Sequence, residues 1–309
     1  LVIATDRDGD SATKFDLYEG EFMAILNNET QVSVFVGGFV GGLDHPECVN
    51  WGMDGYAYAG GEAGQIYRVD VRSGECEQIA STGGFVGGLA QDGSRNVYAC
   101  SNGAVMRIAP DGAVDTYTTG TADEPLRVPN YPVFDGEGNL YVSDSGEWKQ
   151  DDGCIYKVRP GGEASVWCRA LTQFPNGLCL SPAGDFLYVV MSLNSPRIER
   201  IRIEPDGSAG EIEEVVQLPE TVPDGLAFDT DGNLYISCYR PDRVYRLSPQ
   251  GKLEILAEDF EGTVIAAPTN VAFCGEERDI LLSANLGRWH LTRYEAGATG
   301  VALNYPVIP

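Results

Sequence analysis

The sequence predicts an all-β protein, a six-bladed β-propeller with four antiparallel strands per blade, and three observations lead to it. Proline stands directly before a polar or short residue at the start of five apolar runs, and Val86-Gly87 repeats this frame without the proline. The five pairs are Pro46-Glu47, Pro129-Asn130, Pro175-Asn176, Pro223-Asp224 and Pro268-Thr269. Successive copies are about 40 to 48 residues apart, which is a typical spacing for propeller blades. Each copy then continues with glycine-containing turns and further short apolar runs, as linked short strands require.

The fifth copy shows the pattern of one blade most clearly. Residues 223–228 form the first apolar run, and Asp231-Gly232 ends a turn that tolerates the positive φ of a hairpin. A second strand is expected at residues 233–238, a third at 243–247 with alternating faces, and an outer strand at 253–257. The same order of segments predicts one blade from each of the other copies.

The remaining blades follow in chain order. Their first three strands are predicted at residues 47–51, 56–59 and 66–69; 87–90, 96–99 and 105–108; 130–134, 140–143 and 155–158; 176–178, 186–190 and 200–203; and 269–273, 280–283 and 290–294. Residues 31–36 resemble an outer strand and precede the first copy, so they are predicted to complete the sixth blade and close the ring. Radial repetition of this kind leaves only short, protected sheet edges.

Composition limits the possible partners and surroundings. We predict that residues 1–309 form a single domain, because 309 residues suit one closed propeller. We also expect no membrane partner, because no apolar stretch is long enough to span a membrane. The formal net charge of −25 excludes nucleic acid as a favoured partner. The eight cysteines fall in or near apolar runs without a Cys-x-x-Cys pair, which indicates a reducing compartment. Residues 1–10 show no signal-peptide pattern, so we expect a cytoplasmic protein, either a monomer or a weak homo-oligomer.

The residues that follow the prolines are expected to meet at one end of the central channel. Each begins the innermost strand of its blade, so the ring contains Glu47, Gly87, Asn130, Asn176, Asp224 and Thr269. Carboxylate and amide oxygens without cysteine are ligands for a hard cation such as calcium, magnesium or manganese. The alternative is a channel whose polar side chains hold only ordered water. Two neighbouring carboxylates would repel each other without a cation, which favours a metal site.

Three segments resemble the senescence marker protein 30 (SMP-30)/gluconolactonase family, which includes regucalcin-like proteins. Residues 223–225 with 231–239 and 243–244 are similar to its fifth-blade signature. Residues 175–178 are similar to its fourth-blade signature, and Pro46-Glu47 resembles its N-terminal metal glutamate. The resemblance extends from about residue 31 to residue 294. It implies a six-bladed propeller with one divalent cation at the mouth of the channel.

The resemblance also implies the ligands and the reaction. Glu47, Asn176 and Asp224 would bind the cation, and Asn130 would flank the site and touch the substrate. Calcium is the expected ion, with magnesium, manganese, zinc and iron as alternatives. We expect a lactonase acting on a small lactone, with a sugar lactone as the first candidate substrate. The cation would polarise the ring carbonyl, Asp224 would also act as general base, and Glu47 would mainly supply charge.

Three further residues are candidates for substrate binding. The family often has an arginine two residues before the third-blade asparagine, whereas Arg127 lies three residues before Asn130. His290 and Trp289 fall near the loop of the sixth copy that opens on the same rim. His290, like His45, is a candidate proton relay, and Trp289, like Trp148, is a candidate wall for a ring-shaped substrate. Packing roles are the alternative for all four side chains.

Two other functions remain open on the sequence alone. A metal-dependent phosphotriesterase or arylesterase would use the same scaffold and a similar cation. A non-catalytic propeller would use the cation only for structure and the mouth of the channel for binding.

Overall fold

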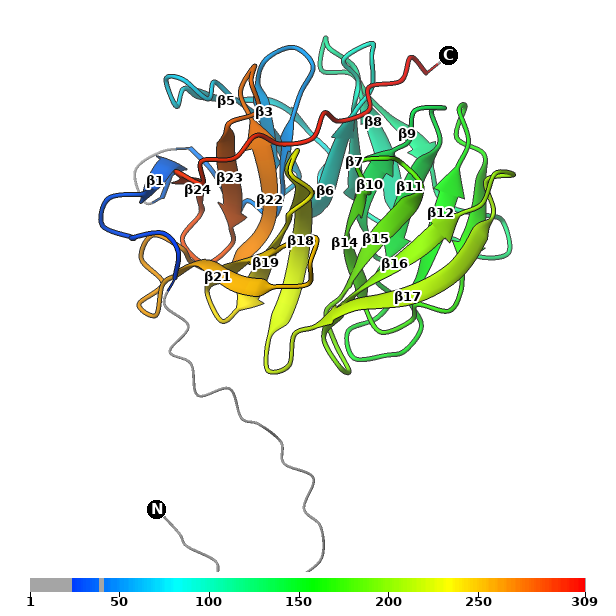
Figure 1. Cartoon of the computed structure of the whole chain (residues 1–309). Coiled ribbons are helices and arrows are strands. Elements are labelled where there is room, and N and C mark those ends of the chain that lie inside the picture. The colour runs from blue at the N-terminus through cyan, green and yellow to red at the C-terminus, as the bar shows by residue number, and fades with distance from the viewer. Residues whose placement is uncertain (1–23, 39–41, 309) are drawn as a thin grey trace, which may run out of the picture.

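The computed structural model confirms six four-stranded antiparallel sheets arranged around a central channel (Figure 1). It describes residues 24–38 and 42–308. The prediction that the single domain includes residues 1–23 and 39–41 therefore concerns residues outside the described part. Within that part every regular element is a strand, and no helix is present that would be long and apolar enough to cross a membrane.

The strands follow the blades in chain order. Blade 1 contains β2 (Val49–Trp51), β3 (Ala57–Gly60), β4 (Gln65–Val69) and β5 (Cys76–Ser81). Blade 2 contains β6 (Val86–Gln91), β7 (Val97–Ser101), β8 (Ala104–Ile108) and β9 (Val114–Thr118). Blade 3 contains β10 (Pro129–Phe134), β11 (Leu140–Asp144), β12 (Cys154–Val158) and β13 (Ala164–Cys168). Blade 4 contains β14 (Pro175–Leu180), β15 (Phe186–Met191), β16 (Arg197–Ile203) and β17 (Ala209–Gln217).

The last two blades show how the ring closes. Blade 5 contains β18 (Val222–Phe228), β19 (Leu234–Arg240), β20 (Arg243–Leu247) and β21 (Leu253–Glu258). Blade 6 contains β22 (Pro268–Cys274), β23 (Ile280–Asn285), β24 (His290–Tyr294) and, as its outer strand, β1 (Val32–Gly37). β1 pairs antiparallel with β24, with Val32 opposite Tyr294, which confirms the predicted closure.

The hydrophobic core is divided into layers between neighbouring blades. Each of the six buried clusters takes its side chains from two adjacent blades, as in the layer that joins Val69 of blade 1 to Leu282 of blade 6. Edge-to-face aromatic pairs recur in these layers, with ring centroids 5.0 Å apart for Tyr98–Phe134 and 5.1 Å apart for Tyr235–Phe273. Both faces of a blade are therefore covered, which is why the inner strands are nearly continuous apolar runs.

In blades 2, 3 and 5 the turn between the first and second strands depends on one aspartate. In blade 5, Asp229 accepts hydrogen bonds at Oδ1 from the backbone N–H groups of Asp231 and Asn233. Its Oδ2 accepts bonds from the Asn233 side chain at 2.8 Å and the Tyr235 hydroxyl at 3.1 Å. Asp92 makes the equivalent bonds in blade 2. The predicted turns form because this side chain satisfies the backbone donors that a tight turn leaves unpaired.

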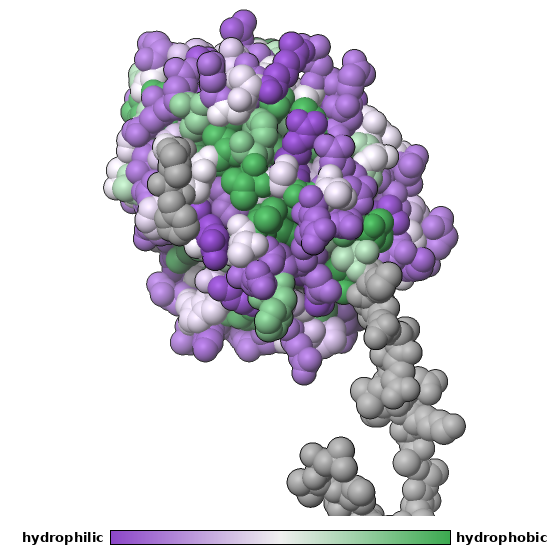
Figure 2. All heavy atoms as spheres, turned by 90° about the vertical axis from the view of Figure 1, so that its left-hand side faces the viewer, coloured by the Kyte–Doolittle hydropathy of each residue, from purple (hydrophilic) through white to green (hydrophobic). Residues whose placement is uncertain are grey.

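The outer surface is predominantly hydrophilic, as the net charge of −25 requires. Figure 2 shows the side of the molecule that carries β1, where a band of apolar side chains is surrounded by polar ones. Val34 of β1 and Ile25 are 44% and 41% exposed on the described surface.

The C-terminal segment after β24 crosses the end of the channel at which the inner strands finish (Figure 1). The Asn304 side chain donates to the Phe134 carbonyl of blade 3, and the Tyr305 hydroxyl donates to the Trp51 carbonyl of blade 1. Ile308 is buried in the layer between blades 2 and 3. The segment therefore links blades that are far apart in sequence.

We expect Ile308→Ala to reduce the free energy of unfolding by about 2 to 4 kcal/mol, because it leaves a cavity between two blades. Leu303→Ala is the matched control in the same segment: Leu303 is 40% exposed, and its loss should cost less than about 1 kcal/mol. Urea unfolding of both variants measures the difference. Equal small losses would show that the segment does not pack as described.

Candidate metal centre

The end of the channel opposite the C-terminal segment brings Glu47, Asn176 and Asp224 together. β14 and β18 are inner strands of adjacent blades, and Asn176 and Asp224 are the second and third residues of these strands. Both side chains are buried, at 4% and 8% exposure. Glu47 lies just before β2, and its charge and the Asn176 amide are both close enough to affect the pKa of Asp224. The predicted ligand residues therefore share one site.

Glycines make this close approach possible. A Cβ atom at Gly177 would lie 2.2 Å from the Asp224 carbonyl oxygen. A Cβ atom at Gly225 would lie 2.6 Å from the Cα atom of Asn270 in blade 6. Any side chain at either position would force two inner strands apart. The glycines that follow Asn176 and Asp224 thus keep the inner strands of blades 4, 5 and 6 in backbone contact and these two ligand residues near one another.

Two oxygen atoms of the cluster are buried without a donor. No described residue donates a hydrogen bond to Glu47 Oε2 or to Asn176 Oδ1. The Asn176 amide is oriented by its nitrogen, which donates to Ser192 Oγ at 3.1 Å, and Ser192 Oγ donates in turn to the Pro223 carbonyl at 2.7 Å. Buried polar atoms are normally paired, because an unpaired one costs about 1 to 3 kcal/mol. A bound cation would satisfy both of these oxygen atoms, which belong to the same cluster as the Asp224 carboxyl.

Burial and mutual repulsion perturb both carboxyl groups. Burial raises the pKa of Glu47 to about 8. The pKa of Asp224 is raised well above its usual range, first by burial and then by the charge of Glu47, with Asn176 acting in the opposite direction. Ionising both groups without a counter-charge is therefore unfavourable. A divalent cation would balance two carboxylates, and the oxygen-only donor set fits a hard cation.

The other inner-strand residues stand at the same end in different settings. Asn130 is half-buried near the start of β10, and its backbone packs on blade 2, where a Cβ atom at Gly88 would lie 2.4 Å from the Asn130 carbonyl oxygen. Thr269 donates its hydroxyl to the Glu47 carbonyl at 2.6 Å and so holds the segment that carries this ligand. The structure therefore places Asn130 on the same ring as the cluster.

Arg127, the predicted substrate arginine, is bound within its own blade. Its exposed guanidinium contacts the Asp152 carboxylate and the Asp152 carbonyl. Its backbone N–H donates to Asp144 Oδ2 at 2.9 Å. The side chain thus ties the segment before β10 to the loop between β11 and β12.

His290 and Trp289 are adjacent in sequence but lie in different environments. His290 is 1% exposed, and its Nε2 donates to the Val264 carbonyl at 2.8 Å. Trp289 is 36% exposed, and its ring centroid lies 4.2 Å from that of His45. The two neighbours therefore present only the tryptophan to the mouth of the channel.

Sequence reasoning missed a second group of candidate ligands at this end. Asp44, His45 and Glu62 offer ligand atoms within 4.8 Å of one another. His45 Nδ1 lies 2.7 Å from Asp44 and 2.8 Å from Glu62, so these polar groups already satisfy each other. Ser192, which orients Asn176, was also missed, because nothing in its local sequence distinguishes it from other strand-end serines. These contacts form only when separate segments come together.

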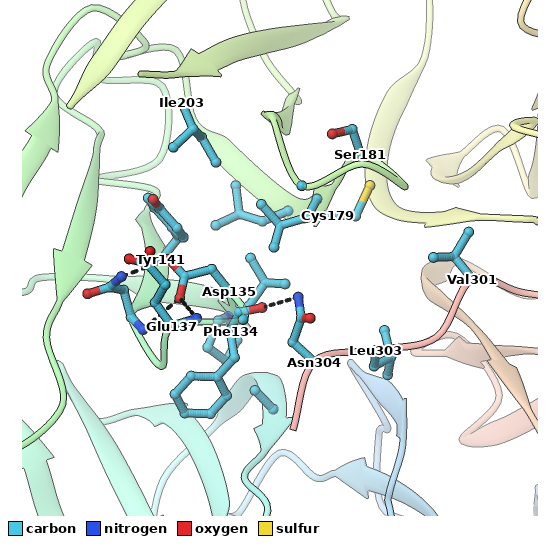
Figure 3. Close-up of a pocket in the computed structure, with 18 of the residues that line it drawn as sticks. Phe134, Asp135, Glu137, Tyr141, Cys179, Ser181, Ile203, Val301, Leu303 and Asn304 are labelled. Atoms are coloured by element: carbon cyan, nitrogen blue, oxygen red, sulfur yellow. Dashed lines mark hydrogen bonds between the residues drawn. The ribbon is translucent and has the colours of Figure 1, made fainter. Parts of the chain in front are cut away.

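A cavity of about 860 Å³ lies at the opposite end, under the C-terminal segment (Figure 3). Apolar side chains such as Cys179, Ile203 and Val301 line it, and none of Glu47, Asn176 and Asp224 does. Its Asp135 carboxylate is held by donors from its own turn, at Glu137 and Asn139. This carboxylate is held within its own turn, and the cavity is also lined by the charged residues Lys157, Arg159, Glu204 and Asp206.

Comparisons with known proteins agree with the fold and the signature segments. The model of the SMP-30/Gluconolactonase/LRE-like region matches residues 47–284. The curated protein strictosidine synthase-like 3 of Arabidopsis thaliana is 30% identical over 152 residues, which are 44% of this chain and 38% of that protein. Lactonase Drp35 of Staphylococcus haemolyticus is 27% identical over 129 residues, 38% of each chain. The chain thus matches well under half of the length of these relatives.

Among solved structures, the gluconolactonase XC5397 of Xanthomonas campestris has the same fold. The TM-score is 0.72 at 20% identity, and the match covers 85% of this chain and 88% of that one.

Proposed function

Because the chain belongs to the SMP-30/gluconolactonase/LRE-like family, we propose that it is a divalent-metal-dependent hydrolase that opens a small lactone. The observation that carries the proposal is the cluster of Glu47, Asn176 and Asp224, with two buried oxygen atoms left without donors. Lactonases occur among its relatives and among proteins of the same fold. Calcium is the ion that the oxygen-only donor set favours, with magnesium, manganese, zinc and iron as alternatives.

The ion, when bound by Glu47, Asn176 and Asp224, supplies a Lewis acid for the lactone carbonyl. Asp224 accepts the proton of the attacking water. Burial first, and then the charge of Glu47, raise the pKa of its carboxyl in the metal-free site, whereas a bound cation would lower that pKa and the acidity of a bound water would compensate. Glu47 supplies the second negative charge, so that two carboxylates balance a doubly charged ion. Asn176 contributes a neutral oxygen whose direction is set by Ser192. We assign to these four side chains the positioning of the reacting groups.

The remaining candidates receive separate roles in this proposal. Asn130 lies on the same ring and contacts the substrate, and the exposed face of Trp289 forms part of the entrance. Arg127 holds the β11–β12 loop through Asp152. His290 acts on the site only indirectly, because it is buried and bonded to the Val264 carbonyl.

Chelation followed by reconstitution with single metals tests the proposal. The chelator-treated protein should lose lactone hydrolysis, and one of calcium, magnesium, manganese, zinc or iron should restore it. The substrates should include sugar and alkyl δ-lactones, aryl esters and phosphotriesters. Hydrolysis that survives chelation would contradict metal dependence. Faster turnover of phosphotriesters would identify the other hydrolase, and no turnover with any metal would identify a binding module.

A further inference from the structure

One position of the repeat, at or before the start of each inner strand, is mostly apolar at the end of the channel that holds the candidate metal centre. It is the position before each proline of the repeat, or before Val86 in blade 2. The residues at this position are His45, Phe85, Val128, Phe174, Val222 and Ala267. Five of the six are apolar, although a position at the mouth of a solvent-filled channel would ordinarily be polar.

Several of these side chains are exposed on neighbouring blades. Phe85 of blade 2 is 44% exposed, and Val128 of blade 3 is 37% exposed. Trp148, in the loop after β11, is 54% exposed and packs edge-on against Phe174 of blade 4, with centroids 5.0 Å apart. We call Phe85, Val128, Trp148 and Phe174 the apolar arc.

The register places the apolar arc at the ligand end of the channel. Pro129 pairs with Asp144, so the start of β10 and the loop after β11 lie at the same end. Pro175 pairs with Met191 in the same way in blade 4. Exposed apolar side chains gathered on blades 2 and 3, with the partly buried Phe174 of blade 4 packed against them, mark a binding surface, because scattered ones would be the norm. Arg127, the neighbour of Val128, is paired with Asp152, and Glu147 and Lys149, of opposite charge, flank Trp148.

From this surface we propose that the substrate is a lactone bearing an alkyl or aryl substituent, which contacts the apolar arc while the ring carbonyl faces the metal centre. The inference rests on the proposed function and narrows its substrate class. A sugar lactone, the first candidate from the sequence, exposes hydroxyl groups that need hydrogen-bonding partners. The arc side chains offer them none apart from the Trp148 indole N–H. A substituent of methylene groups or an aromatic ring would instead gain from leaving water.

Steady-state kinetics on a homologous series tests the inference. With the metal-loaded protein, kcat/KM for 5-methyl-, 5-propyl- and 5-pentyl-δ-valerolactone should rise about three- to four-fold per added methylene group. Glucono-δ-lactone should be a poorer substrate than the pentyl compound. A flat series, or a preference for glucono-δ-lactone, would overturn the inference while leaving the lactonase proposal intact.

Variants locate the effect on the arc. The double variant Phe85→Ser/Trp148→Ser should make kcat/KM nearly independent of the length of the alkyl substituent, mainly because KM for the longer substrates rises. Met53→Ser is the matched control, because Met53 is 46% exposed in the β2–β3 turn at the opposite end. It should leave the dependence unchanged. An unaltered slope in the double variant would place the apolar contact elsewhere and contradict the assignment to the arc.

Binding of non-hydrolysable δ-lactams separates this inference from the proposed function. If no lactone is hydrolysed but lactam affinity still rises with chain length and falls in the double variant, the lactonase proposal fails and the apolar site stands. If lactam affinity is independent of chain length, the inference fails whatever the activity.

Discussion

Asp224→Asn is expected to lower kcat/KM for a lactone by at least about 100-fold, the loss typical when a positioned catalytic group is removed. The substitution removes the proposed base and one of two negative charges that would hold the ion. The buried side chain keeps its size, so the inner strand should remain in place. Calcium should accordingly cease to raise the melting temperature. Steady-state kinetics and thermal unfolding with and without calcium measure the two effects.

Asp206→Asn serves as the control for this variant. Asp206 is an exposed aspartate that lines the cavity at the opposite end, so its loss changes the net charge equally without touching the cluster. It should retain activity and the response to calcium. If Asp224→Asn kept full activity after chelator treatment, the metal-dependent hydrolase would be excluded.

Glu47→Gln is expected to stabilise the metal-free protein at alkaline pH while abolishing activity. The folded-state pKa of Glu47 is about 8, above its ordinary value of 4.5, because the group is buried. The stability that the protonated Glu47 carboxyl contributes to the metal-free protein is therefore fully present below about pH 4.5. This contribution is lost as the pH rises through about 8. The raised pKa of Asp224 acts in the same direction. Glutamine cannot ionise, so it removes part of this loss.

Thermal unfolding in chelator at pH 5 and pH 8.5 measures this effect. The wild type should lose more stability between the two values than Glu47→Gln, and the variant should melt about 4 °C or more above the wild type at pH 8.5. Calcium should restore wild-type stability at pH 8.5 and have little effect on the variant. Parallel pH dependences would mean that Glu47 is not a desolvated neighbour of Asp224, and a simple folding defect would lower the melting temperature instead of raising it.

The repeat made the fold predictable to within a few residues. Turn aspartates, glycines and apolar runs act locally, so each blade could be recognised without knowing its neighbours. The first inner strand shows the limit of this approach. It was predicted from residue 47, but β2 begins at Val49, because Glu47 lies in the irregular segment that Thr269 holds from blade 6. A contact across 222 residues cannot be read from a local pattern.

The side chains predicted for the site differ in how well sequence could place them. Glu47, Asn176 and Asp224 occupy equivalent positions of the repeat, so a closed ring brings them together. The roles of all seven predicted site residues stay predictions, although His290 and Arg127 are bonded to Val264 and Asp152. The pairing of Arg127 and the burial of His290 depend on loop paths, which vary from blade to blade.

By itself the sequence determined the number of blades, the closing strand and the set of oxygen donors at one end of the channel, because all three follow from a repeat whose chemistry is local. Only the tertiary structure decided that Glu47 Oε2 and Asn176 Oδ1 are buried without partners, that Ser192 orients Asn176, and that exposed apolar side chains of blades 2 and 3 lie at the same end. These properties arise between blades, where desolvation and contact depend on residues far apart in the chain.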